Sequence, residues 1–173
     1  MTAVTRKLSE FTAGLRFDDL PDEVAERTRL LVLDHVGIAL RARHAAALND
    51  AMSTALAKLG LGEGSGSVIG DDKGYAPAAA AFYNGNLAHS LDFDDTHARG
   101  SIHPSAPIVP AAFAAAEMTG AHGRDIVAGI VDDLNRRGRG LPPLPAARRS
   151  IRASKAHTLQ IAGTDSADGS QTA

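Results

Sequence analysis

The sequence contains no cysteine and no tryptophan, and aromatic residues make up only 4% of it. Without cysteine the chain can form no disulfide, no thiolate nucleophile and no cysteine-ligated zinc site. No stretch approaches the ~18 consecutive apolar residues that suggest a membrane-spanning helix. The opening residues, MTAVTRKLSEFTAGL, also lack the long apolar core of a signal peptide. We therefore expect a cytoplasmic protein with no membrane contact.

Alanine is abundant in the sequence. Hydrophobic residues make up 44% of its 173 residues, and with so few aromatics much of that share is alanine, the strongest helix former. The net charge is −2, but residues 136–157 hold seven lysines and arginines and no acid. Such a segment could contact nucleic acid. Because it has no aromatic side chains to stack on bases, we expect an unfolded basic tail rather than a nucleic-acid-binding arm.

The apolar spacing and composition predict helices at residues 17–42, 45–59, 76–87, 107–119 and 123–131. On the first of these, one face carries Val24, Thr28, Leu31, His35 and Ile38. The apolar side is widened by Leu30, Leu33, Gly37 and Leu40. We therefore expect this helix to be deeply buried, and His35 to be a hydrogen-bonded core histidine rather than a ligand.

Two segments have no helical pattern. The glycine-rich stretch GLGEGSGSVIG contains neither the dinucleotide fingerprint nor the Walker pattern. It predicts a flexible turn, with at most a short extended piece at residues 67–69. After Val131 the chain holds three prolines within four residues, scattered arginines and a polar end. This composition predicts neither helix nor strand.

The chemistry of the chain concentrates in residues 91–107, LDFDDTHARGSIHPSAP. Its D-x-D-x-T core, Asp92 to Thr96, matches the nucleophile motif of haloacid-dehalogenase-type Mg²⁺ phosphatases. That motif should follow a buried strand, and the preceding NGNLAHSL is a poor strand. A metal site could instead use Asp92, Asp94, Asp95, His97 and His103. The spacing matches no known metal signature, so we expect no metal.

Metal-free acid/base chemistry is the third alternative. Histidine carries protons near neutral pH, and an adjacent aspartate can orient it. Thr96 can donate a hydrogen bond to a substrate carboxylate, while Pro104 and Pro107 stiffen the loop that holds His103. The helix expected to start near Pro107 would turn its free N–H groups toward this loop, where anions bind well. A small di- or tricarboxylic acid is a sensible substrate there.

The segment AAFYNGNLAHSLDFDDTHARGSIHPSAPIVPAAFAAAE resembles the MmgE/PrpD family, which includes 2-methylcitrate dehydratase and cis-aconitate decarboxylase. The shared pattern is an alanine-rich helix ending in N-G, then A-H-x-x-D-[FY]-D-D-T, a short gap, H-P, and a P-A-x-x-A-x-x-E helix. The upstream LPDEVAERTRLLVLDHVGIALRA and GSVIGDDKGYAPAAAA, and the downstream GRDIVAGIV, also fit. The resemblance covers about residues 5–131.

The resemblance implies an all-α fold, the N-terminal part of the family's helical domain, and cofactor-free chemistry on small carboxylic acids in a homodimer. Carried over by position, the catalytic residues are His103, Asp92 and Thr96, and His103 is preferred to His97 because Pro104 follows it. Substrate contacts are expected from the neighbouring residues Asp95, His97 and Ser105.

The chain also departs from the family. Later family positions, including a second histidine, a lysine and a tyrosine, have no match, and the smaller α+β lid domain is absent. The resemblance thus predicts a truncated helical domain at 5–131 and a disordered, non-family tail at 132–173.

The leading hypothesis is a fragment of a cofactor-free lyase or isomerase that acts on small di- or tricarboxylic acids, like 2-methylcitrate dehydratase, and is inactive alone. One alternative is a non-catalytic helical module that associates with itself. The other is the Mg²⁺ phosphatase suggested by the D-x-D-x-T motif.

Overall fold

The computed structural model describes residues 3–45, 49–98 and 100–137 of the chain. The regular secondary structure of this part is helical apart from one two-stranded hairpin, so the all-α prediction is confirmed. No helix in these ranges combines the length and apolar character needed to cross a bilayer. In chain order the elements are α1 (Ala3–Gly14), the 3-10 turn η1 (Phe17–Asp19), α2 (Asp22–Ala45), α3 (Asn49–Lys58), β1 (Gly66–Ser67), β2 (Gly74–Tyr75), α4 (Pro77–His89), α5 (Ser105–Thr119) and α6 (Gly123–Arg137).

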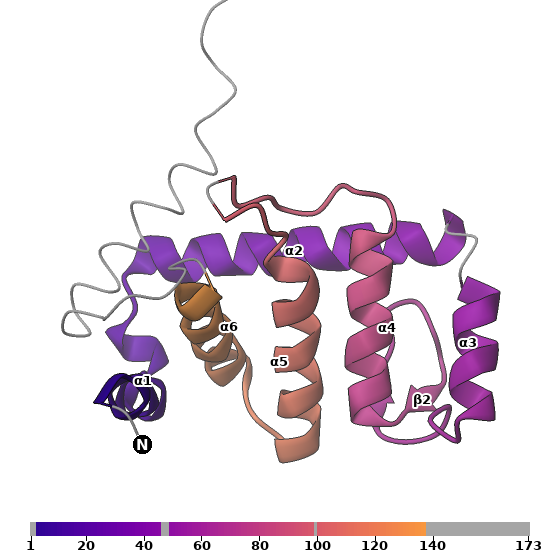
Figure 1. The fold of residues 1–173 in the computed structure, drawn as a ribbon, viewed down its shortest axis with the longest axis horizontal. Coiled ribbons are helices and arrows are strands. Elements are labelled where there is room, and N and C mark those ends of the chain that lie inside the picture. Colours follow the sequence, from indigo (N-terminus) through magenta and orange to yellow (C-terminus); the bar gives the residue numbers. More distant parts are fainter. Residues whose placement is uncertain (1–2, 46–48, 99, 138–173) are drawn as a thin grey trace, which may run out of the picture.

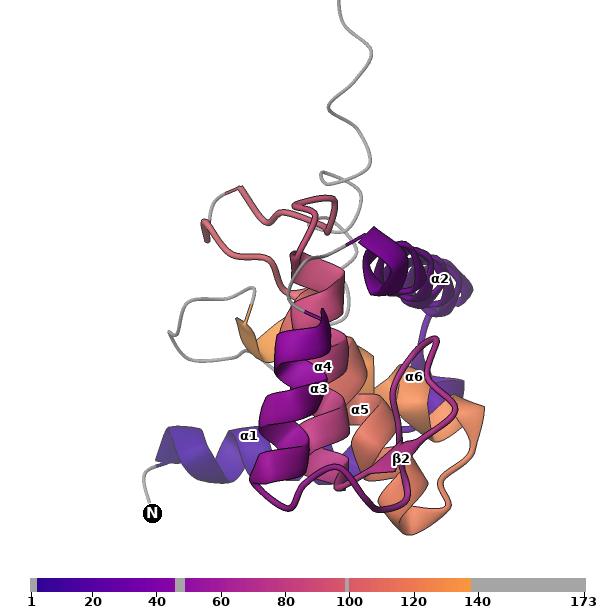
Figure 2. The ribbon, with the colours of Figure 1, turned by 90° about the vertical axis from the view of Figure 1, so that its right-hand side faces the viewer.

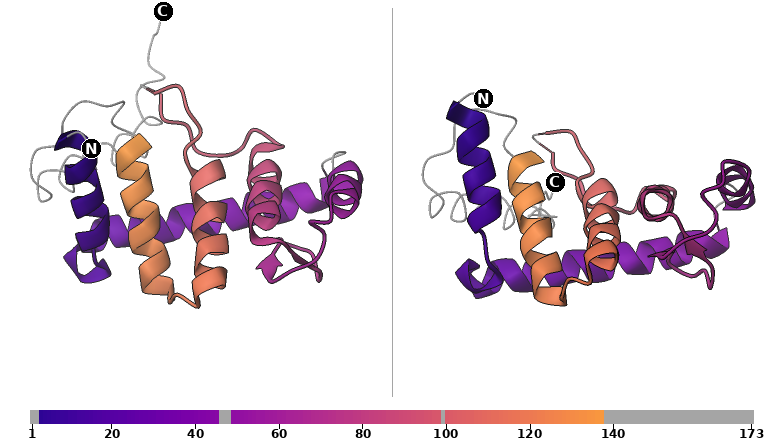
Figure 3. Two further views of the ribbon diagram at one scale, coloured as in Figure 1. Left: turned by 60° about the horizontal axis from the view of Figure 1, so that its bottom comes forward. Right: turned by 90° about the horizontal axis from the view of Figure 1, so that it is seen from below.

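Helix α2 is the longest of the described helices, and three later helices pack across it (Figure 1). Its 24 residues span about 36 Å at 1.5 Å per residue. Helices α4, α5 and α6 lie side by side and cross α2 on one side of it (Figures 1 and 3). The face that meets them is buried and comprises Val24, Ala25, Thr28, Leu31, His35, Ile38, Ala39 and Ala42. The inner face predicted from the sequence is therefore confirmed.

The expectation that α2 is deeply buried all round was wrong. Leu33 is 68% exposed, Leu30 and Leu40 are each 46% exposed, and Gly37 is exposed as well. The physical reason is that the helices packed on α2 all lie on one side of it. Within the part of the chain that the structure describes, the other side is left bare. Figure 2 shows α2 at the margin of the fold rather than at its centre.

Helices α4 and α5 pack closely and set the position of the polar stretch. α5 begins at Ser105, two residues earlier than predicted, and carries Pro110 inside it. Proline has no N–H, so the carbonyl of Ala106 lacks its usual helical partner. Gly85 of α4 lies against that carbonyl, since a Cβ at Gly85 would stand 3.0 Å from its oxygen. The end of α4 and the start of α5 are thus held together, with residues 90–104 connecting them.

Helix α6 continues six residues beyond Val131, where the sequence analysis expected helical structure to stop. That expectation was wrong because an apolar side chain recurs every four residues at Ile126, Ile130 and Leu134. Ile130 is fully buried against α5, and the other two pack against the same cluster. Helix α1, which the sequence analysis did not predict, packs through Phe11 on the cluster of buried residues shared by α2 and α6. Of the tail predicted to be disordered at 132–173, residues 132–137 belong to α6, and residues 138–173 lie outside the described residues.

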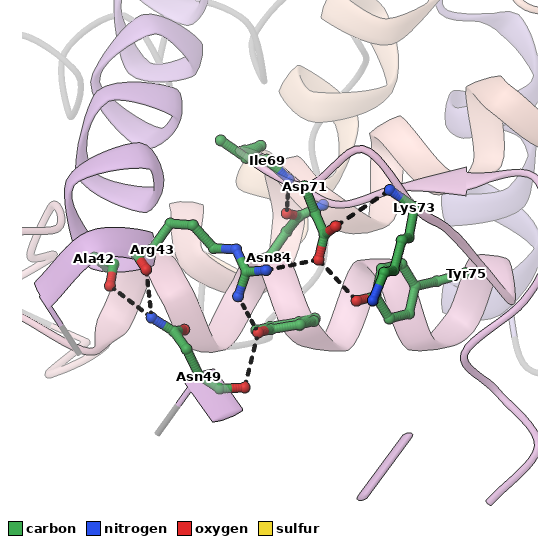
Figure 4. Close-up of polar contacts among 9 residues, drawn as sticks. Ala42, Arg43, Asn49, Ile69, Asp71, Lys73, Tyr75 and Asn84 are labelled. Carbon is green, nitrogen blue, oxygen red and sulfur yellow. Dashed lines mark hydrogen bonds and ion pairs between the residues drawn. The ribbon is translucent and has the colours of Figure 1, made fainter. Parts of the chain in front are cut away.

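The glycine-rich stretch forms a hairpin rather than a turn with one extended piece, because β1 pairs antiparallel with β2. A polar network fastens the hairpin to α2, α3 and α4 (Figure 4). Arg43 donates to a carboxylate oxygen of Asp71 at 2.7 Å and to the hydroxyl of Tyr83 at 2.6 Å. Tyr75 donates to the same Asp71 oxygen at 2.8 Å, and Tyr83 donates to the backbone carbonyl of Asn49 at 3.0 Å. The network therefore links four elements through two buried tyrosines.

The carboxylate of Asp71 is kept ionised by this network. Burial alone would raise its pKa, but hydrogen bonds from the Tyr75 hydroxyl and the Lys73 N–H, together with the charge of Arg43, lower the pKa below its usual value of 3.8. The Asp71 side chain is 6% exposed and that of Arg43 is 20% exposed, so water screens the pair only weakly.

Candidate active site

The polar stretch that follows α4 is an ordered turn. The backbone N–H of His97 donates to the carbonyl of Ile102 at 2.8 Å, and the N–H of Gly100 donates back to the carbonyl of His97 at 3.0 Å. Asp92 has a φ of 55°, in the left-handed region that aspartate tolerates better than most residues. The chain therefore leaves α4, turns sharply at Asp92, and folds back on itself before α5 begins.

Asp94 is the centre of the site. Its side chain is 3% exposed, and its Oδ2 and Oδ1 atoms lie 3.0 and 3.2 Å from Nδ1 of His89. Oδ1 also lies 3.4 Å from Nδ1 of His103. The two imidazole rings meet edge to face, with centroids 4.8 Å apart. One buried carboxylate thus hydrogen-bonds His89, the last residue of α4, and lies beside His103 on the approach to α5, whose Nδ1 has no hydrogen-bond partner among the described residues.

Of the three residues predicted to be catalytic, the structure brings two to this point. His103 contacts Asp94, and a carboxylate oxygen of Asp92 lies within 4.8 Å of the imidazole nitrogens and of Asp94. The Asp92 side chain is exposed, and His103 is 31% exposed, so both can be reached from solvent. Thr96 is exposed as well.

The three residues predicted to contact substrate take part in hydrogen bonds within the loop and at the start of α5. The carboxylate of Asp95 accepts a hydrogen bond at 3.0 Å from the backbone N–H of Ser105, the first residue of α5. The expectation that free N–H groups of this helix face the loop was therefore wrong for the first of them, because Asp95 already occupies it. His97 is buried, and its Nδ1 accepts a hydrogen bond from the N–H of Gly100 at 3.0 Å. Its imidazole is engaged in holding the turn.

The local charge is negative. Burial raises the pKa of the Asp95 carboxyl, and the neighbouring charges of Asp94 and Asp34 add to the effect, while hydrogen bonding from Ser105 opposes it. In the described ranges, no lysine or arginine forms an ion pair with Asp92, Asp94 or Asp95. His89, His103 and the carboxylates of Asp92 and Asp94 therefore lie together, with Asp95 nearby in the sequence and no lysine or arginine paired to these carboxylates in the described ranges.

His35 approaches the site from α2. It is 2% exposed, and neither ring nitrogen has a hydrogen-bond partner among the described residues. It is thus a core histidine, as predicted, but not a hydrogen-bonded one. Burial lowers its pKa from 6.5 to about 4, against the opposing attraction of Asp94. The imidazole of His35 is consequently neutral at physiological pH.

A divalent ion would find nitrogen and oxygen ligands here. His89, Asp92, Asp94 and His103 each offer one ligand atom, and these atoms lie within 4.8 Å of one another. Such a mixed set suits zinc or manganese. The hydrogen bond of Asp94 with His89 and its contact with His103 engage the same atoms without an ion.

Sequence reasoning gave no role to His89, and it considered Asp94 only as a metal ligand or as the second aspartate of the D-x-D-x-T motif. A signal for both was present, because the pattern A-H-x-x-D-[FY]-D-D-T that carries the family resemblance contains them. The five-residue step from His89 to Asp94 crosses the end of a helix. Spacing rules for helices and strands do not apply across such a boundary, so their contact could not be worked out from periodicity.

The fold also bears on the D-x-D-x-T motif. The segment from Asp92 to Thr96 follows helix α4 and not a strand. Asp94, the second aspartate of the motif, is turned toward two histidines rather than toward Asp92 alone. The strand that presents such a motif in a phosphatase is missing from this place.

Known proteins match this chain over its described helical part. The model of the MmgE/PrpD N-terminal domain matches residues 6–132. A cis-aconitate decarboxylase-like protein, oryM, from Aspergillus oryzae is 32% identical over 135 residues, covering 73% of this chain and 26% of that protein. The cis-aconitate decarboxylases of Aspergillus terreus and Mus musculus are 29% and 30% identical, covering 72% and 68% of this chain.

The chain spans only about a quarter of the length of these relatives, from 24% to 26%. The region matched includes both helices that flank the polar stretch and all of its histidines and carboxylates. Helical architecture, the motif and the matched family model agree, and the chain belongs to the MmgE/PrpD family.

Proposed function

We propose that residues 89–105 form one wall of the active site of a lyase or isomerase that acts on small di- or tricarboxylic acids. The observation that supports this most is the contact of one buried carboxylate, Asp94, with Nδ1 of both His89 and His103. A carboxylate held against one nitrogen of an imidazole fixes the ring and leaves the opposite nitrogen, Nε2, for proton transfer.

His103 would act as the acid/base group, with Asp92 and Thr96 placing the substrate. In a dehydration of the 2-methylcitrate type, a proton leaves a carbon next to a carboxylate and hydroxide leaves the neighbouring carbon. In a decarboxylation of the cis-aconitate type, carbon dioxide leaves and a proton is delivered to carbon. Either reaction needs a histidine that can hold or release a proton near pH 7 and is fixed in orientation. His103 is partly exposed and lies beside the buried carboxylate of Asp94, which makes it our candidate for this role.

We further propose that this chain alone has little or no activity. A substrate with two or three carboxylates would meet Asp92, Asp94 and Asp95 without a compensating lysine or arginine in the described ranges. At ~4 Å, two like charges near a protein surface repel by about 4 kcal/mol. Positive groups must therefore come from elsewhere before such a substrate binds well.

The test measures turnover and binding separately. The chain is incubated with cis-aconitate and with 2-methylcitrate, and the loss of substrate and any release of carbon dioxide are followed. Histidine side-chain NMR signals are recorded in parallel for the wild type, His103→Ala and His122→Ala, the last being a remote, exposed control. We expect no turnover, and at high ligand concentration a shift of the His103 signals that His122→Ala retains.

Each outcome decides a different point. Turnover that disappears in His103→Ala would support the site and overturn the claim of inactivity. Turnover that survives His103→Ala would reject the proposed role of His103. Shifts confined to His122, with His89 and His103 unmoved at saturating ligand, would reject the site itself.

The phosphatase alternative has no supporting observation in the fold, because the D-x-D-x-T segment follows a helix. Self-association is favoured by a separate observation, the bare face of α2.

A further inference from the structure

The side chains around the turn at Asp92 bring mixed nitrogen and oxygen ligands to one point. Their ligand atoms lie within 4.8 Å of one another and belong to His89, Asp92, Asp94 and His103. The sequence analysis expected no metal because the spacing along the chain matches no known signature. The fold gathers these residues from the end of α4, the turn and the approach to α5, so their proximity does not depend on a regular spacing.

The ligand set also differs from the one considered from the sequence. Asp95 accepts a hydrogen bond from the N–H of Ser105, and Nδ1 of His97 accepts one from the N–H of Gly100. Both residues are thus engaged in holding the loop. His89, which the sequence analysis did not consider, contributes a second imidazole instead.

The atoms around Asp94 have the spacing of zinc ligands. Zinc binds imidazole nitrogen and carboxylate oxygen at about 2.0–2.2 Å, so two ligands of a tetrahedral ion stand about 3.3–3.6 Å apart. Oδ1 of Asp94 lies 3.2 Å from Nδ1 of His89 and 3.4 Å from Nδ1 of His103. Both separations fit a shared ion after small shifts, and the exposed carboxylate of Asp92 can supply the fourth ligand.

Nδ1 of His103 is a second observation that points to an ion. The atom is buried and has no hydrogen-bond partner among the described residues, although Oδ1 of Asp94 lies 3.4 Å away. A buried nitrogen that makes no hydrogen bond costs free energy. A bond to a metal ion satisfies such a nitrogen, because ligation uses its lone pair and needs no proton.

The charges of the four side chains suit a divalent cation. Two carboxylates together balance its charge, and two neutral imidazoles add none. The Asp94 side chain is 3% exposed, and no lysine or arginine in the described ranges forms an ion pair with it or with Asp92. A buried carboxylate is costly unless it is paired. Because His89 and Asp92 are exposed, an ion can reach the group from solvent.

We propose that one Zn²⁺ ion binds here through Nδ1 of His89 and of His103 and through carboxylate oxygens of Asp92 and Asp94. Zn²⁺ is preferred to Mg²⁺ and Ca²⁺ because half of the ligands are imidazole nitrogens, whereas those two ions take oxygen ligands. The binding does not rest on the proposed lyase activity, although it uses two of the same residues.

One consequence does rest on the proposed function. An imidazole with zinc on Nδ1 keeps its remaining proton on Nε2, so it has no lone pair left to take up another proton. The zinc-bound chain therefore cannot use His103 as a base. Zinc binding and acid/base chemistry at His103 exclude each other.

Isothermal titration calorimetry with Zn²⁺, on the chain without a histidine tag, tests the binding. The wild type should bind one ion per chain. Loss of a group that merely supports a ligand costs about 10–100-fold in metal affinity, so loss of a ligand in His89→Ala or His103→Ala should cost at least about 100-fold. His122→Ala, at an exposed histidine remote from the site, should bind like the wild type.

Asp92→Asn is the most conservative variant of the site. Asparagine adopts the left-handed backbone as readily as aspartate, so the φ of 55° is retained while the charge is lost. Because water can take the fourth position on zinc, we expect a loss of about tenfold or more in affinity. Circular dichroism checks that each variant keeps the helix content of the wild type.

Two spectra report the geometry. Co²⁺ absorbs visible light far more strongly in a tetrahedral site than in an octahedral one, so the wild type and His122→Ala should develop the strong absorption and His103→Ala should not. Long-range ¹H–¹⁵N NMR spectra should place zinc on Nδ1 of His89 and His103.

Zinc binding that is unchanged in His103→Ala and Asp92→Asn, ligation through Nε2, or displacement of Zn²⁺ by an equal concentration of Mg²⁺ would each overturn the proposal. Zinc binding combined with no response of His89 and His103 to cis-aconitate would support the zinc site and count against the proposed function. A response to cis-aconitate without zinc binding would count against the zinc site alone.

Discussion

Replacing His35 should remove most of the acid sensitivity of this fold between pH 6.5 and 4. His35 lies on the inner face of α2, is 2% exposed, and has no hydrogen-bond partner for either ring nitrogen in the described ranges. Burial lowers its pKa from 6.5 to about 4, with Asp94 acting in the opposite direction. The perturbation we consider is His35→Leu, which keeps the volume nearly constant and removes the titrating group.

The size and the sign follow from the two pKa values. The unfolded chain binds a proton at His35 near pH 6.5, whereas the folded chain binds it only near pH 4. The contribution of His35 to stability is therefore complete above pH 6.5 and is lost as the pH falls toward 4. A difference of one unit corresponds to 1.36 kcal/mol, so a shift of about 2.5 units amounts to about 3 kcal/mol. Domains of this size are stable by only about 5–15 kcal/mol in total.

Urea unfolding followed by circular dichroism at steps from pH 6.5 to 4 gives the assay. The wild type should lose about 3 kcal/mol more than His35→Leu over that interval, and His122→Leu, at an exposed histidine, should behave like the wild type. At pH 7 the His35→Leu variant should be no less stable, because two unsatisfied buried nitrogens are removed. Parallel curves for the wild type and His35→Leu, or a His35 NMR titration near pH 6.5, would refute the reasoning.

Three other changes have defined outcomes. Arg43→Met should destabilise the fold by about 2–3 kcal/mol, because it removes two short hydrogen bonds, one to a buried carboxylate and one to a tyrosine. Arg41→Met is the exposed control. Tyrosine fluorescence reports the effect because both tyrosines lie in this network. Asp71→Asn should make unfolding less pH-dependent below pH 3.8, because the lowered pKa of Asp71 stabilises the fold above that pH and the contribution fades on acidification. Gly85→Ala should lower the free energy of unfolding by about 1–3 kcal/mol, and the urea midpoint with it, because its Cβ would press on the carbonyl of Ala106. An unchanged midpoint would reject the close packing of α4 on α5.

The buried face of a helix could be predicted from the sequence where apolar residues recur at a spacing of three or four. All five residues assigned to the inner face of α2 are buried, because packing on one side selects residues three and four apart. Leu30, Leu33 and Leu40 satisfy the same apolar rule, yet they are exposed. Hydrophobicity alone does not say which side of a helix its neighbours will cover. That choice is made by α4, α5 and α6 together.

The chemistry of the site was visible from the sequence, but its arrangement was not. A dense group of carboxylates and histidines between two helices indicated acid/base chemistry, and His103 lies in that group. The buried carboxylate that lies beside His103 is Asp94, however, and its hydrogen-bond partner is His89. Both contacts depend on the sharp turn at Asp92, where φ is 55°. A left-handed aspartate leaves no periodic trace in a sequence, so the direction of each carboxylate had to come from three-dimensional structure.

The surroundings of Asp94 suggest why a neutral His35 is kept so close to the site. A charged imidazole at that position would compete with His89 and His103 for the same carboxylate. Burial keeps His35 neutral above a pH of about 4, so the charge of Asp94 remains available to the two histidines that solvent can reach. A buried carboxylate with a third imidazole beside it would hold each ring less firmly, because its two oxygens offer a limited number of acceptor directions. The low pKa of His35 is therefore a consequence of its burial, which outweighs the attraction of Asp94.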